Sequence, residues 1–164
     1  SCQAIRDVLS RNRQTLLAQL DRVAGKVEMG LRVAWEVPNI FKYFIQTHPS
    51  LRAARDRLAN MPDVMSQEEK IALGQMFESI LQQTRRTHAE MVKEVLSSQC
   101  LEFKDNPCRN LHEVMNLACL VDRDGLKAFD ETILEAAGMF DDHFIFDYSG
   151  PWAPHNFTDI MLDL

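Results

Sequence analysis

The sequence predicts an α+β fold in which a small three-stranded sheet packs with helices and a long helical hairpin projects from it. Residues 26–36 alternate strictly between apolar and other side chains, which is typical of a strand with one buried face. The segments on both sides of this strand repeat their apolar residues at three- and four-residue steps, as amphipathic helices do. Two later apolar runs, 114–121 and 143–148, have the length of strands.

Composition and charge narrow the class of protein. The chain has 164 residues, of which 46% are hydrophobic and 26% charged, so it suits one globular domain with a real core. Its formal net charge of −6 argues against a nucleic-acid surface, which needs an excess of Lys and Arg. No apolar run approaches the roughly 20 residues of a membrane helix. The 4 cysteines form no C-x-x-C pair, so we expect a reducing cytoplasm.

The first predicted elements are a helix over 3–24 and the strand 26–36, with Gly25 as the helix cap between them. We expect one face of the strand to be the core, covered by helices 3–24 and 124–139. That face carries Val27, Met29, Leu31, Val33 and Trp35. We expect the other face to lie open to solvent or to a preceding part of the protein. It carries Glu28, Gly30, Arg32, Ala34 and Glu36.

The next segment reads as a helical hairpin. One arm covers about 39–60 and is interrupted at His48-Pro49, because proline does not continue a helix. The other arm is the longest helix, about 66–99, opened by a capping box between Ser66 and Glu69. Its apolar stripe becomes polar around His88, so this part is either weakly packed or faces a partner.

The last third of the chain is predicted as loop 100–111, strand 114–121, helix 124–139 and strand 143–148. A right-handed crossover would make the last two strands parallel, and the hairpin lets the first two run antiparallel. Both conditions hold if strand 26–36 lies in the middle. The result is a three-stranded split βαβ sheet, half of a ferredoxin-like arrangement. We divide the chain into a sheet module (1–36 and 112–149), a hairpin insertion (37–111) and an irregular C-terminal tail (150–164).

A search for chemistry finds no G-x-S-x-G, Gly-rich phosphate loop or H-E-x-x-H. Cys108 and His112 are four positions apart, but two ligands do not complete a zinc site. We therefore predict no catalytic, cofactor-binding or metal-binding residues. A metal-binding module that also uses Cys100, or a helical scaffold, remains the alternative.

The C-terminal tail is the one segment whose sequence indicates a recognition element. Gly150-Pro151-Trp152-Ala153-Pro154 restricts the backbone with two prolines and presents a large indole. In one interpretation, Trp152 and Phe157 hold the tail on its own sheet. In the other, Gly150, Pro151, Trp152 and Phe157 form a partner-binding surface. The two roles are compatible.

Four segments resemble the gas vesicle protein F/L family (GvpF/GvpL), and the resemblance spans nearly the whole chain. They are residues 25–35, 73–78, 116–121 and 146–157. The last is the strongest and is similar to the family's closing pattern, an aromatic strand followed by Gly-Pro-Trp-Pro-Pro-Tyr-x-Phe. This sequence departs from the pattern at Ala153 and His155, where Pro and Tyr are usual.

The resemblance implies a non-enzymatic accessory protein in the cytoplasm of bacteria or archaea, associated with gas vesicles. Family members are expected to bind the small hydrophobic shell protein, with other accessory proteins as further partners, and to assist vesicle assembly. They combine an N-terminal ferredoxin-like part with a helical coiled-coil part and a tail. This chain would be the C-terminal portion, and the family supplies no catalytic residue to carry over.

Overall fold

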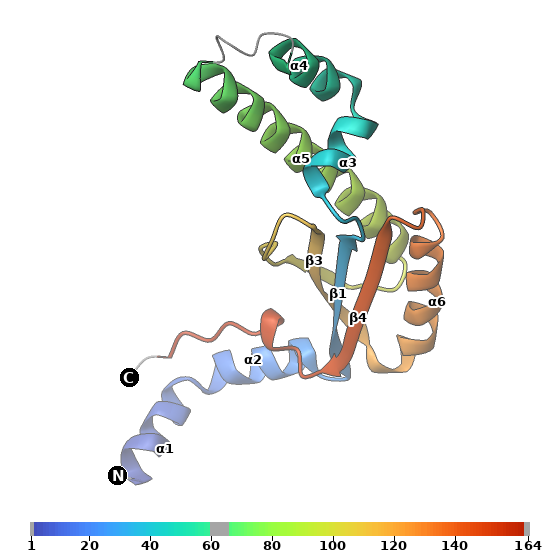
Figure 1. Cartoon of the computed structure of the whole chain (residues 1–164). Coiled ribbons are helices and arrows are strands. Elements are labelled where there is room, and N and C mark those ends of the chain that lie inside the picture. Colours follow the sequence, from blue (N-terminus) through green and yellow to red (C-terminus); the bar gives the residue numbers. More distant parts are fainter. Residues whose placement is uncertain (1, 60–65, 163–164) are drawn as a thin grey trace.

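The computed structural model describes residues 2–59 and 66–162, which form helices, strands and two 3₁₀ turns (Figure 1). The first half of the chain contains α1 (Cys2–Arg11), α2 (Arg13–Val23), β1 (Lys26–Trp35), α3 (Ile40–Thr47), α4 (Pro49–Ala59) and α5 (Gln67–Leu96). The second half contains β2 (Glu102–Asp105), β3 (Glu113–Asp122), η1 (Arg123–Gly125), α6 (Leu126–Ala137), β4 (Phe144–Trp152) and η2 (His155–Phe157).

The strands form one antiparallel sheet in the order β2-β3-β1-β4. β1 lies between β3 and β4, as predicted, and pairs with Asp122 at one end and Phe144 at the other. Because β3 and β4 both run antiparallel to β1, they are parallel to each other, which confirms the predicted directions.

The prediction of three strands is wrong, because residues 102–105 form a fourth strand inside the segment expected to be loop. β2 pairs with β3, and further backbone bonds flank it from Leu101 N–H to Leu120 O (2.8 Å) and from Asn106 N–H to Asn116 O (2.7 Å). The sequence Glu-Phe-Lys-Asp shows no apolar face, so its pattern does not predict a strand. Main-chain bonds to the apolar β3 hold this short edge strand in place. With β2 included, the sheet elements follow the order β-α-β-β-α-β. The predicted three-stranded sheet, half of a ferredoxin-like arrangement, is therefore wrong.

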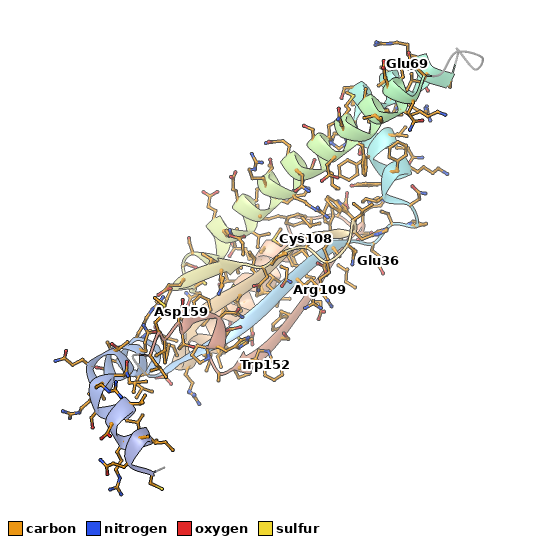
Figure 2. All side chains as sticks on the ribbon, turned by 90° about the vertical axis from the view of Figure 1, so that its left-hand side faces the viewer. Glu36, Glu69, Cys108, Arg109, Trp152 and Asp159 are labelled. Carbon is orange, nitrogen blue, oxygen red and sulfur yellow. The ribbon has the colours of Figure 1, made fainter. Side chains whose placement is uncertain are left out.

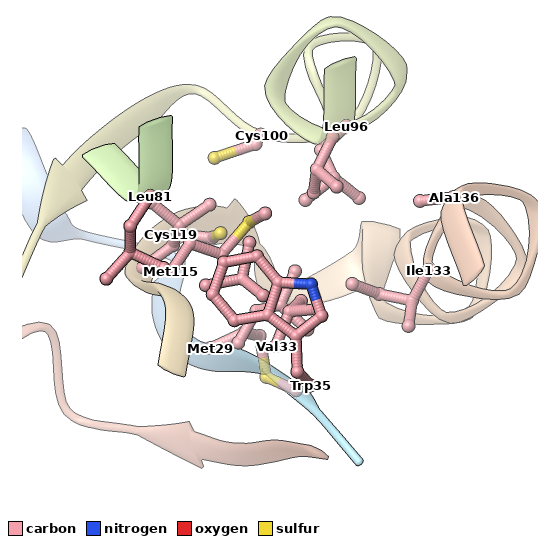
Figure 3. Packing of buried hydrophobic residues seen from close by; sticks show 14 of the residues in the cluster. Met29, Val33, Trp35, Leu81, Leu96, Cys100, Met115, Cys119, Ile133 and Ala136 are labelled. Carbon is pink, nitrogen blue, oxygen red and sulfur yellow. The ribbon is translucent and has the colours of Figure 1, made fainter. Parts of the chain in front are cut away.

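The core lies on one face of the sheet, under α5 and α6 (Figure 3). The alternating row on β1 is buried, with exposed fractions of 0–4%, as its pattern predicts. Leu81 and Leu96 of α5 and Ile133 of α6 pack over it. The same cluster continues into the base of the hairpin, where the ring of Trp35 meets Phe44 edge-on at 5.2 Å between centroids. The hairpin is therefore anchored in the core of the sheet.

The helix predicted over 3–24 does not cover the sheet. It is divided into α1 and α2 at Asn12, and both extend away from the sheet (Figure 1). Gly25, with φ +71°, turns the chain between α2 and β1, and α5 and α6 already occupy the apolar face. The apolar side chains of the two helices remain 46–63% exposed at Ile5, Leu9, Leu17 and Leu20.

The hairpin follows the sequence closely. α3 ends at Thr47 and α4 begins at Pro49, so the predicted interruption is confirmed. Ser66 and Glu69 form the capping box that opens α5, with the Ser66 hydroxyl accepting from Glu69 N–H at 3.2 Å. Phe41 contacts Phe77 across the hairpin, with 5.0 Å between ring centroids. The two arms thus pack through aromatic side chains where they approach the sheet.

Candidate partner-binding surface

The second face of the sheet carries charged and small side chains, and the tail covers one end of it. Arg32 of β1 donates to the Asp147 carboxylate of β4 at 2.7 Å and lies 3.8 Å from Glu113 of β3. At the other end, Glu28 is only 3% exposed. The expectation that this face lies open, to solvent or to a preceding part of the protein, is therefore wrong around Glu28.

The first residues of the tail continue strand β4, which runs to Trp152. The register of its pairing with β1 shifts opposite Met29. Gly150 occupies this irregular position with φ +124°, and the Gly150–Pro151 peptide is cis. A Cβ on Gly150 would lie 2.8 Å from Met29 Sδ and 2.9 Å from the Glu28 carbonyl oxygen. Close backbone approach thus explains the glycine, and it fixes the course of the chain into Trp152.

A buried carboxylate then holds the tail against the sheet. The Glu28 carboxylate accepts from Asn156 N–H at 2.9 Å and from Asn156 Nδ2 at 2.5 Å. Nδ1 of His155 lies 3.5 Å away from the same carboxylate. Lys104 of β2 donates to the Asn156 carbonyl at 3.1 Å. The buried charge is hydrogen-bonded, as a stable interior requires.

The residues singled out in the tail face different ways. Phe157 is 5% exposed and packs on Ala118 and Leu120 of β3. Trp152 is 56% exposed, projects from the outer strand (Figure 2), and its Nε1–H reaches Ser149 Oγ at 3.4 Å. Pro151 is also exposed. Phe157 therefore holds the tail against β3, and the indole of Trp152 lies at the surface.

Sequence reasoning missed two exposed apolar residues of β4, Ile145 (47% exposed) and Tyr148 (46% exposed). Ile145 is paired with Ala34 and therefore stands on the second face, beside a hollow of ≈ 470 Å³ that Arg32 and Glu113 also line. An isoleucine in the outward-facing row of an alternating strand was the available signal. Tyr148 is paired with Leu31 and therefore stands on the core face. Together with Trp152, these are the exposed apolar side chains along the β4 edge, on both faces of the sheet, and we call them the β4 apolar row (Ile145, Tyr148 and Trp152).

Cys108 and His112, which were considered for a metal site, contact different backbone carbonyl oxygens. Cys108 Sγ lies 3.7 Å from the Val114 carbonyl oxygen, and His112 Nε2 lies 3.2 Å from that of Val37. Burial raises the pKa of the Cys108 thiol. Within residues 2–59 and 66–162, no three His, Cys, Asp or Glu side chains gather as metal ligands. No helix in these ranges combines the length and apolar content needed to cross a bilayer.

Comparison with known proteins identifies the family. The family model for gas vesicle synthesis protein GvpL/GvpF matches residues 1–159. The chain belongs to the GvpL/GvpF family. It is 25% identical to gas vesicle protein F2 of Halobacterium salinarum over 162 residues, which cover 99% of this chain and 55% of the relative. It is 23% identical to gas vesicle protein F of a Streptomyces species, covering 95% of this chain and 64% of the relative.

Solved GvpF structures share the fold. The crystal structure of GvpF from Anabaena superposes with a TM-score of 0.85 at 20% identity, over 96% of this chain and 64% of that protein. GvpF from Microcystis aeruginosa gives a TM-score of 0.79 at 17% identity, over 98% of this chain and 66% of that protein. The chain thus spans between 55% and 66% of the length of these GvpF proteins.

Proposed function

We propose that this GvpL/GvpF-family chain is a non-enzymatic assembly factor that binds the small hydrophobic shell protein of gas vesicles. It would act in the cytoplasm, on gas vesicles under assembly, with other accessory proteins as further partners. Family membership supports a gas vesicle role. The observation that favours protein binding is a large indole, 56% exposed, on a backbone that is fixed on both sides.

Under this proposal the four candidate tail residues, Gly150, Pro151, Trp152 and Phe157, have different roles. Trp152 is the contact residue, since exposed tryptophans on ordered backbone are frequent hot spots of protein interfaces. Gly150 and Pro151 set its position, because the close approach to Met29 admits no side chain at Gly150. Phe157 acts indirectly, as the anchor that keeps the following turn on β3. An ordered platform loses little conformational entropy on binding.

The test is co-purification of the shell protein with the tagged chain, comparing the native sequence with Trp152→Ala. Leu134→Ala is the matched control, because Leu134 is 71% exposed on α6 and lies outside the tail. We expect the shell protein to be captured by the native chain and by the control, and at least tenfold less by Trp152→Ala, as hot-spot residues behave. No capture by the native chain would overturn the proposed function. Equal capture by both variants would overturn the role of Trp152 alone.

A further inference from the structure

The two edges of the sheet differ in a way that the tail does not explain. β2 is four residues long, and both of its carboxylates are paired: Glu102 with Arg22 at 2.6 Å, and Asp105 with Lys93 at 2.6 Å. Short, charged strands are how proteins protect a sheet edge from pairing with another chain. β4 is nine residues long and carries the β4 apolar row. Residues 144–149 of β4 therefore lack the protection that β2 has.

The register shows which main-chain groups of β4 face outward. Glu36 N–H donates to the His143 carbonyl at 2.6 Å, so these two residues form a hydrogen-bonded pair just before β4. Such pairs alternate along an antiparallel ladder, so Ile145, Asp147 and Ser149 bond to β1. The intervening positions 144, 146 and 148 turn their N–H and C=O groups away from the sheet.

One of these outward groups is already used. Phe144 N–H donates to the Asp141 carbonyl at 3.2 Å, within the turn before β4. This bond agrees with the derived alternation, because Phe144 N–H faces away from β1. The N–H groups of Phe146 and Tyr148 remain on the open side of the outermost strand. Two donors, with carbonyls on the same residues, match the spacing of one further strand.

Side-chain charge does not block this edge between residues 144 and 149. Its one charged residue, Asp147, is held by Arg32 at 2.7 Å on the second face of the sheet. The residues beside it on the edge are apolar or aromatic, with Ile145 on the second face and Tyr148 on the rim of the core face. Only at Pro151, beyond this stretch, does the sequence itself remove a main-chain donor.

We propose that the free edge of β4, residues 144–149, binds an extended apolar segment of a partner chain as a fifth strand of the sheet. Main-chain bonds to Phe146 and Tyr148 give the affinity, and Ile145 and Tyr148 contact alternate side chains of the segment. This inference rests on the proposed function, under which the partner is the shell protein. Trp152 is the last residue of β4 and lies at the end of the same edge.

The charge of the chain favours such a partner over a second copy. The chain carries a net charge of −6, and Asp141 and Asp142 stand exposed immediately before β4. Edge-to-edge pairing of two copies would join two chains that each carry a net charge of −6. A neutral or basic apolar segment meets no such repulsion.

The test uses variants of the full chain in the shell-protein capture assay. Tyr148→Pro removes one outward N–H and leaves the bonds of Asp147 and Ser149 to β1, whereas Tyr148→Thr removes the ring and keeps the N–H. Ile145→Lys places a charge on the edge, and Leu134→Lys places the same charge on the exposed face of α6. We expect at least tenfold weaker capture by Tyr148→Pro and Ile145→Lys, and capture within threefold of the native chain by Leu134→Lys. Tyr148→Thr loses the contact of the ring but keeps the main-chain bond, so we expect it to capture more shell protein than Tyr148→Pro does. Thermal unfolding identifies any variant that fails to fold. If Tyr148→Pro fails to fold, Ile145→Lys still tests the proposed edge.

Residue-resolved amide exchange gives an independent result. The amides of Ile145 and Asp147 should be protected in the free chain, and those of Phe146 and Tyr148 only after the shell protein is added. If the native chain captures the shell protein and the two edge variants capture it equally well, the inference is overturned while the proposed function stands. If the native chain captures none, the proposed function fails. If Phe146 and Tyr148 become protected in a dimer without shell protein, a second copy is the occupant and the inference is wrong.

Discussion

Glu28 and Asn156 are 128 positions apart in the sequence and are joined by hydrogen bonds of 2.9 and 2.5 Å. The carboxylate belongs to β1 and is 3% exposed, while the asparagine belongs to the 3₁₀ turn η2 (His155–Phe157) of the tail. A buried carboxylate is stable only when its oxygens are hydrogen-bonded. The position of the tail and the stability of β1 are therefore coupled through this pair.

The first prediction is that Asn156→Ala destabilises the chain by about 2 kcal/mol, because it removes a bond to a charged, buried acceptor. Glu28→Gln should cost less, since it removes the buried charge and its amide oxygen can still accept one of the two bonds from Asn156. A double-mutant cycle by urea unfolding should give a coupling energy of about 1 kcal/mol or more. Additive effects would show that the two residues act independently.

The central strand and the hairpin were predictable because local patterns determine them. The alternation on β1, the capping box at Ser66 and the interruption at Pro49 each depend on neighbours in the sequence. The family resemblance was also visible in the sequence and is confirmed by the match over residues 1–159. The order of the strands followed from connection rules, which constrain the elements once their types are known.

The parts that were missed depend on contacts between distant segments. β2 is recognisable only through its partner β3, since Glu-Phe-Lys-Asp by itself shows no strand pattern. The apolar stripe of 3–24 has the pattern of a core helix, but the pattern does not say which surface it packs on. The hydrogen bonds of Glu28 could not be derived from its own position in an outward row. Trp152 and Phe157 were predicted as candidate site residues, and their opposite orientations could not be predicted from the sequence.

The second prediction compares two glycines. Gly150→Ala should destabilise the chain by roughly 1–3 kcal/mol, because φ is +124° and the new Cβ would lie 2.8 Å from Met29 Sδ. Gly74→Ala is the matched control, because it lies in α5 with nothing within 4 Å of its Cβ. We expect the control to stabilise by about 0.5–1 kcal/mol, as helix propensity requires. Urea unfolding of both variants tests the pair, and a neutral Gly150→Ala would contradict the close-contact account.

The third prediction concerns pH and His88 of α5. Its ring contacts Phe140 and Phe144, each at 5.2 Å between centroids, and its Nδ1 is buried without a hydrogen-bond partner. Burial lowers the pKa of His88 below 6.5, and the nearby Asp141 carboxylate opposes this only in part. The polar part of the α5 stripe thus packs on aromatic rings of its own chain.

Because the folded state resists protonation of His88, the unfolded state binds the proton more readily below pH 6.5. Stability from the neutral ring is therefore present above pH 6.5 and is lost as pH falls toward the lower pKa of the folded state. Urea unfolding at pH 7.5 and 5.5 should show this loss, and His88→Leu should reduce it. Gly74→Ala keeps every histidine and should retain the native pH dependence. An unchanged pH dependence in His88→Leu would exclude the residue as its source.

The last prediction separates the two roles of the tail. Phe157→Ala should cost about 3 kcal/mol, because the ring is 5% exposed and its removal leaves a cavity against Ala118 and Leu120. Trp152→Ala should change stability by only about 0.5 kcal/mol, since its ring is 56% exposed and the bond from its indole N–H to Ser149 Oγ is long at 3.4 Å. Thermal unfolding measures both. A large loss in Trp152→Ala would mean that the indole also holds the tail, and its effect on capture of the shell protein could then not be assigned to contact with the partner. A small loss leaves the indole free for recognition, while Phe157 keeps the tail on the sheet.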